Sequence, residues 1–309
     1  MKSKVAIVGM GNVGATIAYN IVINSGCDTL IITDSNKKLA NAQMLDLRHA
    51  AAVSKSTVKV NIGNYNDFND VDIVIFTAAT PLVLGQTRLD MLESSKNIVD
   101  RVIPHIMESG FNGIFVIVTN PVDIISFYVY KISGLPASNI IGTGTALDTA
   151  RLKMVLSSLL DVNVSDITAY IIGEHGDSQV IVWSQICVKN MPLEEYCIRN
   201  NINKFDKEKV AELVKNVGWD IANVKHTTNF GIASVVKDIL DSILNNEKKL
   251  MLVSNLIEND RKEYFTSCPV LIGRSGIERK IVFSLSSEES MQLKKSSVLL
   301  KKITSKMNI

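Results

Sequence analysis

The sequence predicts an α/β protein with a doubly wound parallel sheet in its N-terminal half and an α+β arrangement in its C-terminal half. Two observations support this. Up to residue 143, short apolar runs rich in β-branched residues alternate with longer helical patterns, as in a parallel sheet covered by helices on both faces. After that point, helices are followed by several consecutive strands. We therefore expect one domain over residues 1–143 and a second over residues 144–309.

Unbroken or alternating apolar runs indicate the strands, and apolar residues three and four positions apart indicate the helices. In the first half we expect strands over residues 4–8, 29–33, 57–61, 71–76, 113–118 and 139–141, and helices over residues 15–25, 37–51, 87–109 and 124–132. In the second half we expect helices over residues 145–160, 207–224 and 231–245, strands near 167–172, 180–188, 249–256, 266–273 and 278–284, and a final helix from residue 288.

Composition excludes several classes of function. Lys and Arg number 33 against 31 Asp and Glu, so the net charge of +2 predicts no binding of nucleic acid or of an anionic membrane. The four cysteines form no C-x-x-C pair and no cluster with histidine, which favours isolated thiols in a reducing compartment and predicts no metal site. Residues 5–23 are uncharged, but their glycine spacing argues against a signal peptide or membrane anchor. We expect a soluble, cytoplasmic protein.

The hexapeptide Gly-Met-Gly-Asn-Val-Gly, which begins at Gly9, lies between the first predicted strand and the first predicted helix. In such a motif Gly9 permits a tight turn, Gly11 lets the backbone approach a pyrophosphate, and Gly14 lets the helix pack close to the strand. The backbone N–H groups at the helix start, at Asn12 and Val13, then face the phosphate. The motif therefore predicts a dinucleotide site.

A second predicted strand ends in Asp34, twenty residues after Gly14. An acid at this offset accepts hydrogen bonds from ribose hydroxyls and repels a 2′-phosphate, so it favours NAD over NADP. The alternative interpretation is that Asp34 caps the helix that begins near Lys37. The order of these elements favours an NAD-binding domain of the type called a Rossmann fold. In sequence they are a strand, the glycines, a helix, a second strand and the acidic residue.

Ligands of open parallel sheets bind at the carboxyl ends of the strands, where this sequence places several polar residues. Thr77 and Ala78 follow the fourth strand, and Asn120 follows the fifth. Asp148 and Arg151 follow the sixth and lie three residues apart on one helical face, where an ordinary surface ion pair is the alternative.

His175 lies between Gly173 and Gly176 after a predicted strand, where it could exchange a proton near neutral pH. A histidine that merely occupies a tight turn is the alternative. The polar residues at the neighbouring strand ends favour a catalytic role.

With these motifs the chain resembles the L-lactate and L-malate dehydrogenase family from Lys4 to the C-terminus. The resemblance rests on the glycine motif with Asp34 and on three stretches: Thr-Asn-Pro-Val-Asp at 119–123, Leu-Asp-Thr-Ala-Arg at 147–151, and Gly-Glu-His-Gly-Asp-Ser at 173–178. It implies the NAD-linked, reversible reduction of a 2-keto acid to the L-2-hydroxy acid.

The resemblance also implies a role for each residue. His175 would donate a proton to the carbonyl oxygen, and Asp148 would orient and stabilise its imidazolium. Arg151 would bind the substrate carboxylate with two parallel hydrogen bonds. Arg88, carried by a closing loop, would polarise the carbonyl. Asn120 would bind near the nicotinamide, and Thr77 and Ala78 would also lie against the cofactor.

Substrate choice in the family depends on a loop position that is Leu82 here. Leucine cannot neutralise a second carboxylate, so malate is disfavoured. Thr228 matches the lactate type at the opposite pocket wall. We expect a glycolytic L-lactate dehydrogenase, with an L-2-hydroxyisocaproate-type enzyme as the alternative and a non-catalytic NAD-binding protein as a weaker one. The family also implies a homo-oligomer, dimeric or tetrameric. Lys153 and Thr168 stand where relatives activated by fructose 1,6-bisphosphate have arginine and histidine, so we expect no activation by that compound.

Overall fold

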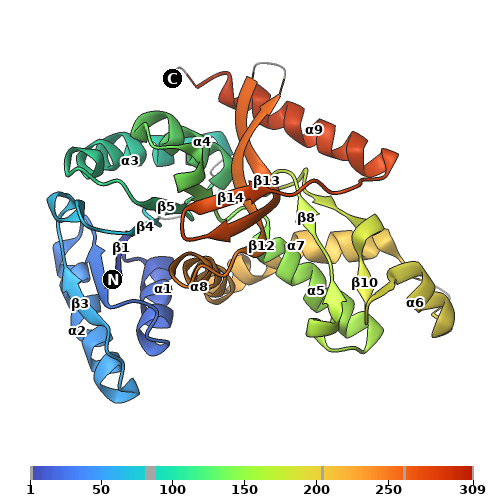
Figure 1. Ribbon diagram of the computed structural model, residues 1–309, viewed down its shortest axis with the longest axis horizontal. Helices are drawn as coiled ribbons and strands as arrows, with labels where there is room; N and C mark the ends of the chain where they lie inside the picture. The colour runs from blue at the N-terminus through green and yellow to red at the C-terminus, as the bar shows by residue number, and fades with distance from the viewer. Residues whose placement is uncertain (1–2, 81–87, 203–204, 260–261, 308–309) are drawn as a thin grey trace.

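The computed structural model of the chain describes residues 3–80, 88–202, 205–259 and 262–307 (Figure 1). Within these ranges, nine strands form one sheet in the order β14-β13-β12-β6-β5-β4-β1-β2-β3. The strands β1 to β6 are mutually parallel, and the chain leaves β1 first toward β2 and β3 and later toward β4, β5 and β6. Their bounds are Lys4–Val8, Thr29–Thr33, Lys59–Ile62, Ile73–Phe76, Ile114–Ile117 and Ile140–Gly142. The predicted doubly wound fold is confirmed.

Alternate residues of β1 face two separate apolar cores. Val5 and Ile7 pack in a core that includes residues of α1 (Asn12–Ile23), α2 (Lys37–Ser54) and α8 (Phe230–Leu244). Ala6 and Val8 pack in a second core with α3 (Arg88–Glu108) and α4 (Val122–Ser133). Because side chains of a strand alternate between its faces, helices cover both faces of the sheet.

The C-terminal half contributes to the same sheet. Strands β12 (Lys249–Asn259), β13 (Lys262–Gly273) and β14 (Gly276–Lys280) form an antiparallel meander, which joins the parallel strands where Ser254 pairs with Gly142. Helix α8 also packs on the N-terminal sheet. The two halves therefore share an apolar core and one sheet, and Figure 1 shows β12 near the centre of the molecule.

The remaining elements form a lobe with a core of its own. It contains α5 (Ala146–Leu160), α6 (Leu193–Arg199) and α7 (Lys207–Lys225), with five short strands between α5 and α6, and α9 (Ser287–Thr304) closes the chain. The short strands are β7 (Ile167–Thr168), β8 (Ile171–Ile172), β9 (Val180–Ile181), β10 (Cys187–Val188) and β11 (Met191–Pro192).

Three strand predictions in the second half were wrong in extent. The predicted strand 167–172 divides because β7 pairs with β10 whereas β8 pairs with β9, and the predicted strand 180–188 divides around a 3-10 helix at Trp183–Gln185. The last strand ends at Lys280 rather than at residue 284, and helix α6 was not predicted. An apolar pattern does not reveal where a strand changes its pairing partner.

The packing of α1 against β1 gives a test of the fold. A Cβ atom at Gly14 would lie 1.9 Å from the carbonyl oxygen of Gly9, so we expect Gly14→Ala to destabilise the protein by about 2–4 kcal/mol, measured by urea unfolding. The control is Gly11→Ser, because a Cβ at Gly11 meets nothing within 4 Å and serine is a good N-cap. Equal stability of Gly14→Ala and Gly11→Ser would contradict this packing.

Candidate active site

His175 lies in a turn whose backbone is fixed by neighbouring elements. Gly173 adopts φ of +90°, which favours glycine, and exchanges two backbone hydrogen bonds with Ser267 of β13 at 2.9 and 3.0 Å. The N–H of Glu174 donates to the hydroxyl of Ser296 on α9 at 2.9 Å. The turn that follows β8 is thus attached to both β13 and α9.

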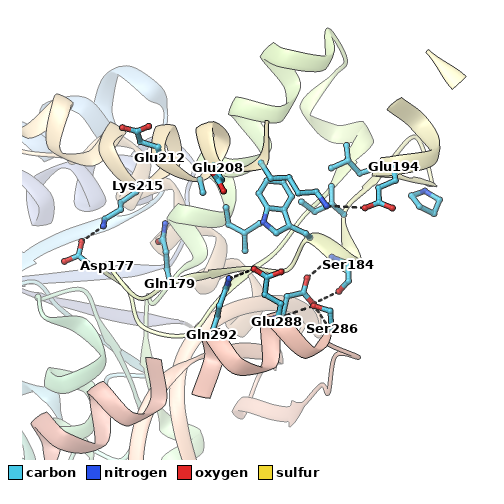
Figure 2. Close-up of a pocket in the computed structure, with 18 of the residues that line it drawn as sticks. Asp177, Gln179, Ser184, Glu194, Glu208, Glu212, Lys215, Ser286, Glu288 and Gln292 are labelled. Carbon is cyan, nitrogen blue, oxygen red and sulfur yellow. Dashed lines mark hydrogen bonds and ion pairs between the residues drawn. The ribbon is translucent and has the colours of Figure 1, made fainter. Parts of the chain in front are cut away.

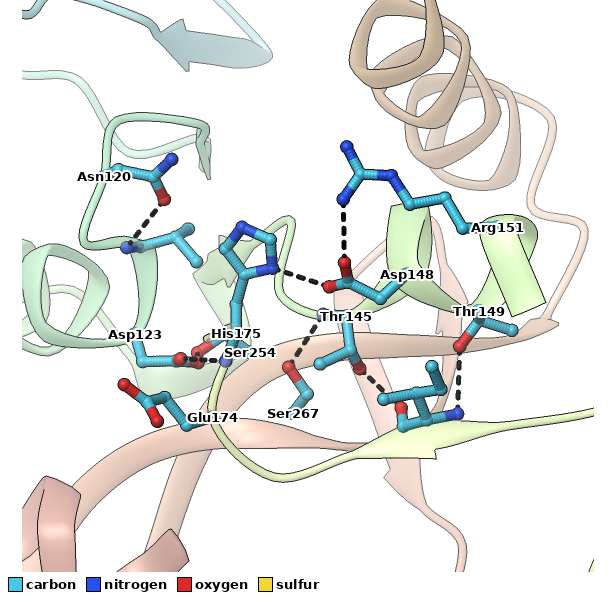
Figure 3. Close-up of polar contacts among 12 residues, drawn as sticks. Asn120, Asp123, Thr145, Asp148, Thr149, Arg151, Glu174, His175, Ser254 and Ser267 are labelled. Atoms are coloured by element: carbon cyan, nitrogen blue, oxygen red, sulfur yellow. Dashed lines mark hydrogen bonds and ion pairs between the residues drawn. The ribbon is translucent and has the colours of Figure 1, made fainter. Parts of the chain in front are cut away.

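The imidazole of His175 meets the carboxylate of Asp148 on the first turn of α5 (Figure 3). Its Nδ1 lies 2.6 Å from Oδ2 of Asp148, and Nη1 of Arg151 donates to Oδ1 of the same carboxylate at 3.0 Å. The Asp148–Arg151 ion pair is therefore real, but it is not an isolated surface pair, since Asp148 is only 3% exposed. Figure 3 shows the other ring nitrogen of His175 pointing away from Asp148, between Asn120 and Arg151.

Burial and charge act in opposite directions on this pair. Burial alone would lower the pKa of His175, but the charge and hydrogen bond of Asp148, together with the charge of Asp123, outweigh it, so the pKa is raised. Burial alone would raise the pKa of Asp148, but His175 and Arg151 outweigh it, so the pKa is lowered. Both shifts favour an imidazolium paired with a carboxylate. Such a ring can deliver a proton from the nitrogen that does not face Asp148.

Arg151 is held beside the histidine by α7. A Cβ atom at Gly218 would lie 3.2 Å from Nη2 of Arg151, so the glycine lets the helix backbone approach the guanidinium. The side chain of Arg151 is 14% exposed, and one of its five N–H donors is used by Asp148. Donors remain for an anion such as a carboxylate.

Of the other predicted site residues, Asn120 lies near His175 in Figure 3, whereas no contact among the described residues joins Thr228 to this group. Oδ1 of Asn120 accepts the N–H of Val122, at 3.3 Å, which turns the amide nitrogen to the other side (Figure 3). Thr228 is half-buried in the segment between α7 and α8. Leu82 lies outside the described residues, and Arg88 is described only as the first residue of α3, without its side chain.

The glycine motif has the geometry of a phosphate-binding turn. Gly9 adopts φ of +97°, and a Cβ there would lie 2.8 Å from the backbone of Ala78. The hydroxyl of Thr77 donates to the carbonyl of Gly9 at 2.8 Å, so Thr77 and Ala78 support the turn from β4. A Cβ at Gly11 would face open space, as close approach of a pyrophosphate requires.

The residues around the motif also fit a dinucleotide. Asn12 and Val13 begin α1, where their N–H groups have no partner within the helix, and the side chain of Val13 packs on the core. The carboxylate of Asp34 accepts the N–H of Met10 at 2.7 Å and that of Asn36 at 2.8 Å. The cap of α2 is Asn36, so Asp34 does not cap that helix and the alternative interpretation is wrong. Asp34 keeps lone pairs for ribose hydroxyls.

A separate cavity lies away from His175. It has a volume of about 1080 Å³ and is bounded by α6, α7 and the start of α9 (Figure 2). Its walls carry Glu194, Glu208, Glu212 and Glu288 and contain none of the predicted site residues. Surplus carboxylates disfavour an anionic substrate there.

Within the described ranges, no group of three His, Cys, Asp or Glu could hold a metal ion. In the same part of the chain, no helix is long and apolar enough to cross a membrane.

Sequence reasoning missed the residues that hold the backbone of His175. Asp123 accepts its N–H at 2.7 Å, and Asp123 in turn bonds Ser254 of β12. Asp123 is the last residue of the Thr-Asn-Pro-Val-Asp motif at 119–123, and this motif was the only indication in the sequence that Asp123 lies at the site. No signal indicated Ser254, which lies 131 residues further along the chain.

Comparisons with known proteins agree with this geometry. Residues 3–142 match the model of the lactate/malate dehydrogenase NAD-binding domain, and residues 145–308 match that of the family's alpha/beta C-terminal domain. L-lactate dehydrogenase 3 of Bacillus thuringiensis subsp. konkukian is 39% identical, with 96% of each chain covered. L-lactate dehydrogenase of Clostridium botulinum (strain Loch Maree) is 35% identical, with 97% of this chain and 95% of that one covered.

Among solved structures, the ligand-bound minor L-lactate dehydrogenase from Enterococcus mundtii superposes with a TM-score of 0.93. The two are 34% identical, and the match covers 100% of this chain and 99% of the other. A lactate dehydrogenase from a deep-sea metagenome library also superposes with a TM-score of 0.93. The two are 31% identical, and the match covers 100% of both chains. Two family models together match nearly the whole length of the chain, and the histidine, aspartate and arginine of the family's motifs meet at one edge of the sheet. The chain therefore belongs to the lactate/malate dehydrogenase family.

Proposed function

We propose that the protein catalyses the NAD-dependent, reversible reduction of pyruvate to L-lactate. The observation that carries this proposal is the contact of His175 and Arg151 with one buried carboxylate, that of Asp148, at the carboxyl edge of an NAD-binding sheet. The names of the two relatives described above, both L-lactate dehydrogenases, at 39% and 35% identity, support the same reaction.

In this proposal the turn at Gly11 and the carboxylate of Asp34 hold NADH, which supplies the hydride when bound. His175 donates its proton to the carbonyl oxygen of the substrate, where negative charge develops. Asp148 keeps the ring oriented and stabilises it while charged. In the reverse direction neutral His175 accepts the proton from the hydroxyl group.

Arg151 binds the carboxylate of the substrate, because its planar donors fit two carboxylate oxygens. Arg88, the first residue of α3, would polarise the carbonyl. The amide of Asn120 would bind the nicotinamide end of the cofactor. By the family resemblance, Thr228 and Leu82, the latter outside the described residues, are the residues proposed to accept the methyl group of pyruvate.

Four further properties belong to the proposal: an oligomeric state, a cytoplasmic role in glycolysis, a domain division and a lack of activation. The family supports a homo-oligomer, dimeric or tetrameric, and a cytoplasmic role in glycolysis. The matched family models support a division into domains at residues 143 and 144. Lys153, whose pKa is lowered by burial and by Lys249, and Thr168 support the absence of activation by fructose 1,6-bisphosphate.

A panel of 2-keto acids tests the substrate. With NADH and purified protein, we expect pyruvate to give the highest kcat/KM. Oxaloacetate should be lower by roughly two orders of magnitude or more, because its second carboxylate meets no cation at Leu82. A preference for 2-ketoisocaproate would instead support the L-2-hydroxyisocaproate-type enzyme.

The matched control is His175→Gln. Its kcat should be about a thousandfold lower than that of the wild type, whereas its NADH binding, measured by fluorescence, should be retained.

The role of Arg151 is tested by Arg151→Lys. Lysine keeps the charge but offers no planar pair of donors, so we expect the KM for pyruvate to rise roughly thirtyfold, a loss of about 2 kcal/mol. NADH affinity should stay at the wild-type value. A KM equal to that of the wild type would show that the substrate carboxylate binds elsewhere.

A further inference from the structure

Two carboxylates converge on His175, one on its ring and one on its backbone. Asp148 contacts the imidazole, whereas Asp123, the second residue of α4, contacts the peptide group (Figure 3). Oδ2 of Asp123 accepts the N–H of His175 at 2.7 Å, and its Oδ1 accepts the hydroxyl of Ser254 at 2.5 Å. Asp123 is 2% exposed and Ser254 is fully buried.

We propose that Asp123 is a positioning residue for the proton transfer: anchored by Ser254, its carboxylate fixes the backbone of His175, and its negative charge favours the protonated ring. This inference rests on the role proposed above for His175.

The backbone of the turn needs such an anchor. Glycines lie on both sides of the pair Glu174-His175, so the chain has more conformational freedom there than elsewhere. Ser267 holds the backbone of Gly173, and Ser296 accepts the N–H of Glu174. The N–H of His175 is in turn held by Asp123. A displacement of about 1 Å at a catalytic group can cost roughly a hundredfold in rate. The 2.6 Å contact between His175 and Asp148 would not survive such a displacement.

Asp123 also acts through its charge. Burial raises its pKa to about 6, against the opposing effects of the hydrogen bonds from Ser254 and His175. His175 and Glu174 are the ionisable groups that face it, with Asp148 and Arg151 beyond the imidazole. At neutral pH Asp123 is therefore mostly charged. Burial lowers the pKa of His175, and Asp123 adds to the larger effect of Asp148 that raises it.

Ser254 provides a graded way to weaken this charge. Its hydroxyl lowers the pKa of Asp123, so its removal moves that pKa up toward neutral pH and leaves part of Asp123 protonated there. A neutral Asp123 no longer attracts the imidazolium.

The experiment follows the titration of His175 by NMR in three variants of the full chain, without substrate or cofactor. Asp123→Asn keeps a hydrogen-bond acceptor for His175 but removes the charge, and we expect the midpoint of His175 to fall by about one pH unit, or tenfold in proton affinity. The kcat/KM for pyruvate should fall about tenfold above both midpoints. Ser254→Ala should also lower the His175 midpoint and the kcat/KM for pyruvate, each by a smaller amount.

Ser126→Ala is the matched control. Ser126 is equally buried on α4, and its hydroxyl makes no hydrogen bond with the described residues, so the His175 midpoint should stay at the wild-type value. The proposal is overturned if Asp123→Asn and Ser254→Ala both titrate like Ser126→Ala. If Asp123→Asn does not fold, the comparison of Ser254→Ala with Ser126→Ala decides alone. Because the titration needs no turnover, a wild type that reduces no 2-keto acid would sink the proposed function separately.

Discussion

The buried carboxylate of Asp148 is the group on which the site depends. It accepts hydrogen bonds from a guanidinium and an imidazole at 3.0 and 2.6 Å while it is only 3% exposed. A buried charge without such partners would be costly, and so would the two cations without it. The carboxylate of Asp148 therefore fixes the position of His175 relative to Arg151. A 2-keto acid needs both groups, because its carbonyl oxygen takes a proton from His175 and its neighbouring carboxylate binds Arg151.

The fold explains how these groups meet. Asp148 and Arg151 follow β6, and Asn120 and Asp123 follow β5, so all four lie at the carboxyl edge of the parallel sheet. His175 comes from the C-terminal half and is brought to this edge by β13, α9 and Asp123. Because β12 to β14 extend the same sheet, the cofactor half and the substrate half form one continuous framework at the site.

The sequence predicted the doubly wound half well, since five of its six strands are short apolar runs that the fold buries, and the exception, β3, lies at the edge of the sheet. It also singled out His175, Asp148 and Arg151, whose motifs are specific to one family and whose side chains the fold brings into contact. It failed where local pattern carries no information on pairing, as in residues 167–188, which change sheets twice. It could not find the bond from Asp123 to Ser254, because contacts across 131 residues depend on tertiary packing alone.

The most direct test of the account compares the pH dependence of kcat/KM in the two directions. Pyruvate reduction needs the imidazolium of His175 and should decline as pH rises through its pKa, whereas lactate oxidation needs the neutral ring and should decline as pH falls through it. The two profiles should share one midpoint, above the ordinary value for histidine because Asp148 and Asp123 together outweigh burial. Profiles that decline in the same direction, or that have separate midpoints, would contradict His175 as the proton donor.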